Sequence, residues 1–304
     1  ILSKHGDYLS KLAEKNKVNL EFEASVAGGV PIIRTIKEGL VSNKISKLIG
    51  ILNGTSNYIL TEMEHSGKKF SDVLKEAQNS GFAEKNPKND LNGNDVSSKI
   101  KILSSLCFKS LISNSKILTN GIENIEVKDI NIVKKLGYRI KLLGITEIIN
   151  NNIFERVHPS LVRINSYIAN INGVFNATII SANPVGQSVM QGEGAGPGPT
   201  TSSLISDLYS IIRGNIKNPF IVPHSKRKKI KIYNYNNYIY ACYFRFEVKD
   251  KSGVLASITN ILAKNKISIE TLIQDPNKKN KGGEAAKAVL SVLKILKNDR
   301  KWNR

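Results

Sequence analysis

Hydrophobic side chains recur along the chain in two rhythms, one typical of helices and the other of strands. Apolar residues three and four positions apart predict helices over residues 4–17, 55–65, 71–81, 95–107 and 200–212. Alternating or unbroken apolar runs predict strands over residues 18–26 and 45–52. The stretch 130–190 predicts short helices and strands in turn, with a hairpin tip at Asn150–Asn152. Such a mixture favours an α/β fold.

The C-terminal part of the chain follows a different pattern. Residues 214–237 are polar and basic and contain proline and asparagine, which predicts a linker. Beyond the linker, alternation over 243–248, a helical stripe over 254–262 and alternation over 267–273 predict a small β-α-β unit. No strand is expected from Asn277 onward.

The chain carries a formal net charge of +20, which raises the question of nucleic-acid binding. The lysines are spread along the sequence, and the basic runs 226–229 and 278–281 lie beside loop-forming residues, so solvated surface is favoured. No apolar run is long enough to span a bilayer, and Ile1–His5 shows no signal-peptide pattern. Two widely separated cysteines, Cys107 and Cys242, favour a reducing compartment and hence the cytoplasm.

The richest candidate chemistry lies between Gly81 and Lys99. Asp95 and Lys99 are four residues apart at the expected start of a helix, so they share one face of it. Spacing alone leaves them either a surface ion pair or, if buried beside a substrate, a proton-transfer pair. Glu84 and Asp90 are either loop carboxylates in water or groups aimed at a cationic part of a substrate.

Four ordered motifs give the chain a resemblance to a known family. They are Phe22–Ile33, Gly50–Leu60, Gly81–Lys99 and Gly194–Gly196. In order and spacing they resemble homoserine dehydrogenase. The resemblance implies an α+β substrate domain with a mixed sheet. It also implies NAD(P)-dependent interconversion of L-aspartate 4-semialdehyde and L-homoserine, in the biosynthesis of threonine, methionine and isoleucine.

The same resemblance implies roles for individual residues. Lys99 would protonate the alkoxide that hydride transfer leaves on the substrate. The substrate-binding carboxylates would be Glu84, Asp95 and Asp90. The backbone at Gly81 and Gly196 would approach the nicotinamide of NAD or NADP, because glycine has no Cβ to obstruct it. A helix end and a loop turn are explanations for these glycines that could hold at the same time.

The resemblance further implies a monovalent cation, usually sodium. Its ligand positions would be Glu23, Val26, Gly28 and Val30. Oxygen ligands from a glycine-containing loop suit such an ion. Taken alone, the segment predicts only a turn between a strand and a helix.

A second resemblance covers Tyr243–Gln274, which is similar to part of an ACT domain, a partial ferredoxin-like unit. Asp250–Leu255 matches the turn of that family, with Ser252 where proline is usual. An amino-acid effector at the helix N-terminus is implied, and a module that only packs is the alternative. Residues 283–304 are not expected to complete the domain.

These observations predict five segments. They are a remnant of a nucleotide-binding domain (1–17), the substrate and catalytic domain (18–190), a cofactor-side loop and helix (191–213), the linker (214–237) and an incomplete ACT-like domain (238–304). No GxGxxG loop follows a strand, so we expect the nucleotide-binding domain to be missing and the chain to be inactive alone. The family implies a homodimer or a higher oligomer. The alternatives are an amino-acid-sensing module without catalysis and a basic nucleic-acid-binding protein.

Overall fold

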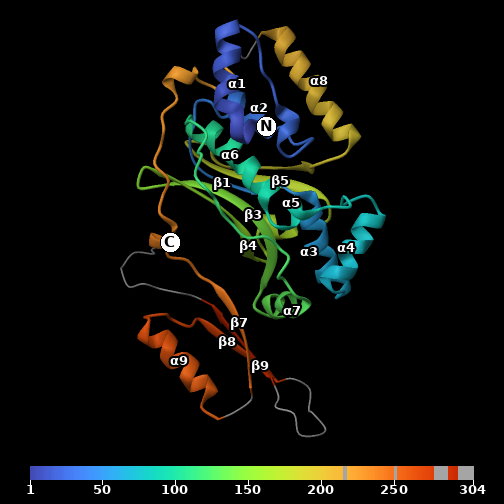
Figure 1. Cartoon of the computed structure of the whole chain (residues 1–304), viewed down its shortest axis with the longest axis vertical. Helices are drawn as coiled ribbons and strands as arrows, with labels where there is room; N and C mark the ends of the chain where they lie inside the picture. Colours follow the sequence, from blue (N-terminus) through green and yellow to red (C-terminus); the bar gives the residue numbers. More distant parts are fainter. Residues whose placement is uncertain (215–217, 250–251, 277–286, 294–304) are drawn as a thin grey trace. The chain divides into compact units, whose positions relative to one another are not determined.

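The chain forms two compact units, Ile1–Tyr233 and Asn234–Arg304, which are described separately (Figure 1). The computed structural model describes residues 1–214, 218–249, 252–276 and 287–293. No helix in this described part is long and apolar enough to cross a membrane.

A six-stranded mixed sheet forms the centre of the first unit. Its strands are β1 (Lys44–Ile51), β2 (Leu118–Thr119), β3 (Tyr138–Ile149), β4 (Asn152–Arg163), β5 (Phe175–Asn183) and β6 (Gly186–Glu193). Their order is β2-β4-β3-β1-β5-β6, and every neighbouring pair is antiparallel except β2 and β4. Asn150 and Asn151 have positive φ in the turn between β3 and β4, as two-residue hairpin turns require, so the expected tip is confirmed.

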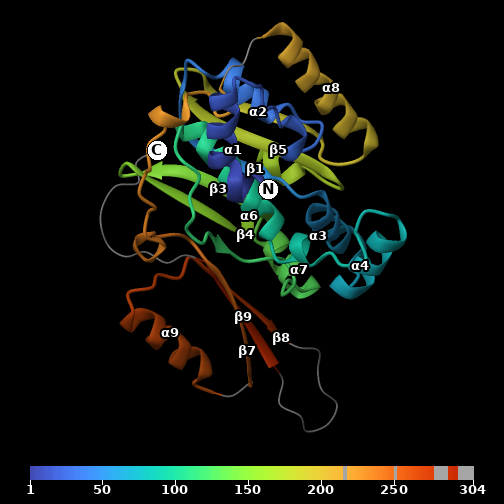
Figure 2. The same cartoon turned by 45° about the horizontal axis from the view of Figure 1, so that its top comes forward.

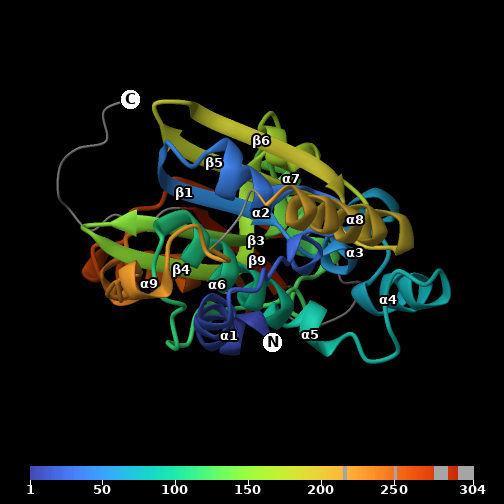
Figure 3. The ribbon, with the colours of Figure 1, turned by 90° about the horizontal axis from the view of Figure 1, so that it is seen from above.

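Helix α6 (Asn94–Phe108) packs across β1, β3 and β4, and α1 (Leu2–Asn16) packs on α6 (Figure 3). The predicted apolar stripe of α6 is confirmed, because Val96, Ile100 and Leu103 are fully buried. Gly144 of β3 allows the helix to approach closely, since a Cβ there would lie 2.5 Å from Ile100 Cγ1.

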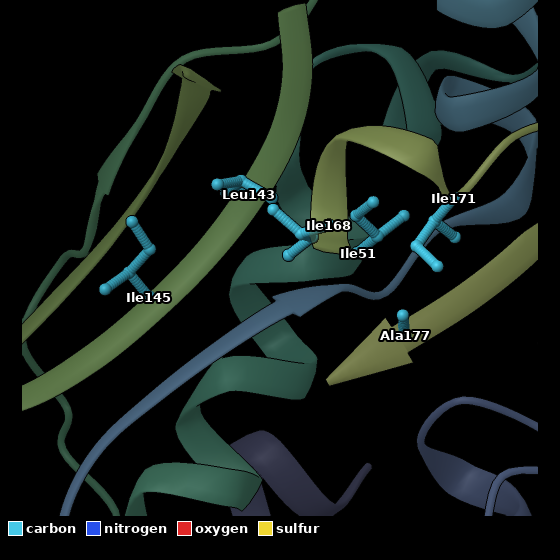
Figure 4. Close-up of a cluster of buried hydrophobic side chains, with 6 residues drawn as sticks. All are labelled: Ile51, Leu143, Ile145, Ile168, Ile171 and Ala177. Atoms are coloured by element: carbon cyan, nitrogen blue, oxygen red, sulfur yellow. The ribbon is translucent and has the colours of Figure 1, made fainter. Parts of the chain in front are cut away.

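The opposite face of the sheet carries a separate apolar cluster (Figure 4). Leu143 and Ile145 flank Gly144 on β3, so they point away from α6. The 3₁₀ helix η3 (Tyr167–Asn170) covers part of this face. The buried members of the cluster are Ile51, Leu143, Ile145, Ile168, Ile171 and Ala177. Ile49, Val162 and Ile179 pack against the cluster and remain partly exposed, so this face is not fully covered within the described chain.

Short helices close one end of the sheet. They are α3 (Gly54–Ser66), α4 (Phe70–Asn79), α5 (Lys88–Leu91) and α7 (Val127–Lys135). Helices α3 and α4 lie side by side, and α3 also contacts β3 and β5 (Figure 2). The N-cap of α3 is Asn53.

Two secondary-structure predictions for the first unit are wrong. Residues 18–26 form no strand but a 3₁₀ turn, η1 (Glu23–Ser25), because the Glu23 carboxylate binds the start of α2 (Ile32–Arg34) and curls the segment around it. The stretch 130–190 consists mainly of long strands, with only the end of α7 and η3 helical. Residues 141–146 of β3 are buried throughout, and burial on both faces removes the alternation that would have marked a strand.

A π-helical turn, η2 (Thr35–Gly39), follows α2 near the start of the chain. The last part of the first unit begins with α8 (Pro197–Arg213). Residues 218–233 lie within the expected linker, yet they pack on the first unit. Single bridges join Lys228 to Ser110 and Ile232 to Ile153, and η4 (His224–Lys226) contacts α1. Arg227 is buried there, so residues 218–233, called the strap below, are part of the first unit.

In the second unit, the described residues form a three-stranded antiparallel sheet with one α-helix. After η5 (Tyr235–Asn237) come β7 (Tyr243–Lys249), α9 (Val254–Lys264), β8 (Thr271–Pro276) and β9 (Lys287–Leu293), in the sheet order β7-β9-β8. This is the beginning of a ferredoxin-like split β-α-β arrangement. The expectation of no strand beyond Asn277 is wrong, because β9 is the central strand and its nearly unbroken apolar sequence hides the alternation. Asp250, Lys251 and residues 294–304 lie outside the described residues.

Candidate active site

The ends of α3, α5 and α6 bring a set of polar side chains together. Asn53 caps α3 with its Oδ1, which accepts a hydrogen bond from the Ser56 amide at 2.8 Å. Its Nδ2 donates to Asp90 Oδ1 at 2.8 Å and to Asp95 Oδ2 at 2.9 Å. One amide side chain therefore joins a helix cap to two carboxylates.

Lys99 completes this cluster. Its Nζ lies 2.8 Å from Asp95 Oδ2 and donates to the Leu52 carbonyl oxygen at 2.8 Å. The side chains of Lys99 and Asp95 are 19% and 28% exposed, so the pair is largely shielded but open on one side. An ammonium has three N–H donors, and these two contacts leave one for an incoming oxygen. The pair is thus a largely shielded ion pair rather than one lying flat on the surface.

Asp90 has an altered acidity. Burial raises the pKa of this carboxyl, and the negative charges of Asp95 and Glu84 act in the same direction. The hydrogen bond from Asn53 and the charge of Lys99 lower the pKa and oppose that shift. The Asp90 backbone carbonyl also accepts a hydrogen bond from Ser56 Oγ at 2.7 Å. A cationic group of a ligand would complete the neutralisation of these acidic side chains.

Glu84 and Gly81 lie at the rim of the cluster. Glu84 is exposed and near enough to Asp90 to affect its pKa, although among the described contacts only the Glu84 backbone is hydrogen bonded, to Gln78. Gly81 has φ +77°, and a Cβ added there would meet nothing within 4 Å. The position therefore borders open space. The structure thus brings Asp90, Asp95 and Lys99 together and leaves Glu84 nearby.

Two glycine-containing loops contact each other, the loop of residues 23–30 and the loop that contains Gly194 and Gly196. A Cβ on Gly28 would lie 2.4 Å from the Gly194 carbonyl oxygen, and the Gly29 amide donates to the Glu193 carbonyl at 3.0 Å. Ser203 Oγ donates to the Gly28 carbonyl at 2.7 Å. Gly196 has φ +115° and ψ 162° at the start of α8, a conformation reserved for glycine. The expected cation loop and cofactor loop are thus neighbours.

The Glu23 carboxylate has a structural task in this region. Its Oε1 accepts from the Ile33 amide at 2.8 Å and its Oε2 from the Arg34 amide at 2.7 Å. Burial raises the pKa of Glu23 to about 7, against the lowering effect of these two backbone bonds. An ion at this loop would therefore rely on carbonyl oxygens. The carbonyls of Gly28 and Val30 each accept one hydrogen bond and keep a second lone pair, so they fit that use.

The sequence analysis missed Asn53 and the Leu52 carbonyl. The sequence suggested Thr55 or Ser56 as the N-cap of this helix, two or three residues beyond the observed cap, Asn53. An available signal was Asn53 followed by Gly54 directly after a buried strand, because asparagine is a preferred N-cap. In the described part of the chain, no group of three or more His, Cys, Asp and Glu side chains is arranged to hold a metal ion.

The fold and this site define a class, an α/β domain with a largely shielded lysine–carboxylate cluster, followed by a ferredoxin-like module. The homoserine dehydrogenase profile matches residues 31–209, and the ACT domain profile matches residues 243–293. A homoserine dehydrogenase of Neisseria gonorrhoeae is 41% identical over 90% of this chain and 64% of its own length. The crystal structure of one from Thiobacillus denitrificans is 38% identical with a TM-score of 0.86, covering 97% of this chain and 68% of that one. The chain belongs to the homoserine dehydrogenase family and spans 64% of the length of the Neisseria relative.

Proposed function

We propose that this chain supplies the substrate-binding and proton-transfer part of a homoserine dehydrogenase, which interconverts L-aspartate 4-semialdehyde and L-homoserine. The observation that carries the proposal is the cluster of Asn53, Asp90, Asp95 and Lys99. A hyperthermophilic archaeal homoserine dehydrogenase is known in complex with NADPH, at 25% identity and a TM-score of 0.62. We propose NADP or NAD as cofactor for this chain as well, in the pathway to threonine, methionine and isoleucine.

The bound nicotinamide would supply a hydride to the aldehyde carbon. The chain's own residues handle the charges. Lys99 donates a proton to the aldehyde oxygen as it becomes an alkoxide, and in the reverse direction it takes that proton back. Asp95 keeps Lys99 in place at 2.8 Å and, with Asp90 and Glu84, attracts the α-ammonium group of the substrate. The backbone at Gly81 and Gly196 would border the nicotinamide.

Helix α8 supports the idea that a further domain completes the enzyme. Its buried positions are polar, namely Ser203, Asp207 and Ser210. Its exposed positions are apolar, namely Leu204, Ile205, Leu208, Tyr209 and Ile212, which are 46–79% exposed. An amphipathic helix with its apolar stripe in water needs a partner. We propose that the nucleotide-binding part of the family covers this stripe.

Further parts of the proposal concern ligands and assembly. A monovalent cation, sodium in the first instance, would bind the loop of Glu23, Val26, Gly28 and Val30 through backbone oxygens. The partly exposed sheet face of Ile49, Val162 and Ile179 would pack against a second copy in a homodimer. The second unit would bind an amino-acid effector at the start of α9, where Gly253 has φ +86°. We also propose a cytoplasmic location for the protein.

The test is reconstitution. The chain is joined to the nucleotide-binding part of a relative, and NADP⁺ reduction with homoserine is followed by absorbance. Lys99→Ala should reduce kcat by about 10²–10⁴-fold, the usual contribution of a general acid, with an unchanged circular dichroism spectrum. Lys101→Ala, which removes a lysine from the same helix, is the matched control and should keep nearly full activity. Full turnover by Lys99→Ala would refute the assignment.

A further inference from the structure

The loop between α4 and α5 carries two of the candidate site residues, Gly81 and Glu84. It runs from the end of α4 at Asn79 to the start of α5 at Lys88. The Glu84 side chain is exposed, and among the described contacts its carboxylate makes no hydrogen bond. The direction in which this carboxylate points therefore depends on the backbone that carries it.

The first half of this loop is tied to both α3 and α4. The amides of Phe82 and Ala83 donate to the Ala77 carbonyl oxygen of α4, at 2.8 and 3.1 Å. Ala83 is buried. Thr55, in the first turn of α3, donates from its Oγ1 to the Phe82 carbonyl oxygen at 2.8 Å. The backbone up to Ala83 is thus fixed relative to the helix start that Asn53 caps.

Gln78 holds the second half of the loop. Its Nε2 donates to the Glu84 carbonyl oxygen at 3.1 Å and to the Lys85 carbonyl oxygen at 3.4 Å. A side-chain amide carries two N–H donors, so one glutamine can serve both carbonyls. Gln78 is half-buried near the end of α4. Among the described contacts it is the side chain that binds the backbone of residues 84–86.

These two hydrogen bonds act on the residue that carries the carboxylate. The Glu84 carbonyl belongs to the same residue as the carboxylate, and the Lys85 carbonyl belongs to the next one. Fixing both carbonyls fixes the backbone on the C-terminal side of Glu84, and the bonds of Ala83 fix the other side. A group that is ordered before the ligand arrives does not lose that freedom on binding, which favours affinity.

We propose that Gln78 is a positioning residue, which aims the Glu84 carboxylate at the α-ammonium group of the substrate and so sets the affinity for homoserine. The inference rests on the proposed function, from which it takes the role of Glu84. Lys99 and Asp95 are held by contacts outside this loop. Loss of the Gln78 donors should therefore weaken substrate binding and leave proton transfer unchanged.

Steady-state kinetics of the reconstituted enzyme test the proposal. Gln78→Met keeps the length of the side chain and its helix preference but removes both donors. KM for homoserine should rise about 3- to 10-fold, the usual contribution of one hydrogen bond, while kcat stays nearly constant. Asn79→Met, which removes the neighbouring exposed amide from the same helix, is the matched control and should change neither constant. An unchanged KM in Gln78→Met would overturn the inference.

A double-mutant cycle shows whether Gln78 acts through Glu84. Effects of independent residues multiply, whereas those of coupled residues do not. In a Glu84→Gln chain, Gln78→Met should therefore change KM by less than about 1.5-fold. The same factor in both backgrounds would mean that Gln78 acts through the stability of α4, and the inference would fail. If Glu84→Gln itself leaves KM unchanged, the role of Glu84 and this inference fall together, whereas Lys99→Ala still decides the proton-transfer proposal.

A crystal structure of the native reconstituted enzyme with bound homoserine gives a test that needs no variant to fold. The Glu84 carboxylate should pair with the α-ammonium group while Gln78 Nε2 stays within hydrogen-bond distance of the Glu84 carbonyl oxygen. A Glu84 carboxylate turned into solvent, or a Gln78 side chain detached from the loop, would contradict the assignment.

Discussion

Lys141 should make the stability of the first unit rise with pH in a window where most proteins lose stability. This lysine on β3 is 1% exposed. Its Nζ donates to the Ile171 carbonyl, to Asn57 Oδ1 at 3.2 Å and to Asn172 Oδ1 at 3.3 Å, all neutral acceptors. Burial lowers the pKa of Lys141 from 10.5 to about 8, only partly opposed by the charge of Glu64, which is itself paired with Arg139.

The sign of the effect follows from proton binding. Between pH 8 and 10.5 the unfolded chain keeps this lysine protonated while the folded chain holds it neutral, so unfolding takes up a proton and stability rises with pH. A shift from 10.5 to about 8 corresponds to about 3 kcal/mol at 1.36 kcal/mol per pH unit. Below pH 8 the folded state carries the full penalty. Replacing Lys141 by methionine removes both the penalty and the slope.

The assay is urea unfolding followed by far-ultraviolet circular dichroism from pH 7 to 10.5. Burial raises the pKa of the Cys107 thiol, which makes the folded state lose stability at high pH, so the quantity to read is the difference between native chain and Lys141→Met. This difference should stay constant below pH 8 and shift by about 3 kcal/mol in favour of the native chain by pH 10.5. Lys47→Met on β1 controls for the loss of one positive charge. Parallel curves for native chain and Lys141→Met over the whole range would refute the reasoning.

Two further predictions concern the site and the strap. Asn53→Ser keeps a helix cap but removes the donors to Asp90 and Asp95. It should lower kcat of the reconstituted enzyme by about 10- to 100-fold, since hydrogen bonds to charged groups contribute roughly 1.5–3 kcal/mol. Unchanged turnover would contradict the positioning role of Asn53. Arg227→Met should lower the free energy of unfolding by about 1–3 kcal/mol, because it leaves the buried Ser110 carbonyl without its guanidinium partner and unpairs Asp7, whose side chain is 30% exposed and can be hydrated. A loss no larger than that of exposed Lys226→Met would show that the strap does not depend on it.

The parts of the structure that follow a single local rule could be predicted from the sequence. The buried stripe of α6 and the pairing of Asp95 with Lys99 both follow from the period of a helix, and the structure confirms them. The hairpin at Asn150 follows from asparagine's tolerance of positive φ.

The parts that depend on contacts between distant segments could not be predicted. Glu23 lies in an alternating sequence typical of a strand, yet its carboxylate binds backbone amides ten and eleven residues away and bends the segment into a turn. The role of Asn53 depends on Asp90 and Asp95, which lie 37 and 42 residues further along the chain. Nothing in the local sequence around Asn53 specifies those partners.

The strand-to-helix junction at Leu52–Gly54 explains why fold and site are difficult to separate in this protein. The Leu52 carbonyl holds Lys99, and Asn53 holds both carboxylates while it caps α3. Gly54 lets the loop of residues 171–175 close over that junction, because a Cβ there would lie 2.8 Å from the Val174 carbonyl oxygen. Lys141 also holds this loop, because its Nζ donates a hydrogen bond to the Ile171 carbonyl oxygen. Lys141 therefore reduces the stability of the first unit near neutral pH, but it also orders the backbone that packs on the candidate active site. Such a compromise is expected where function opposes stability.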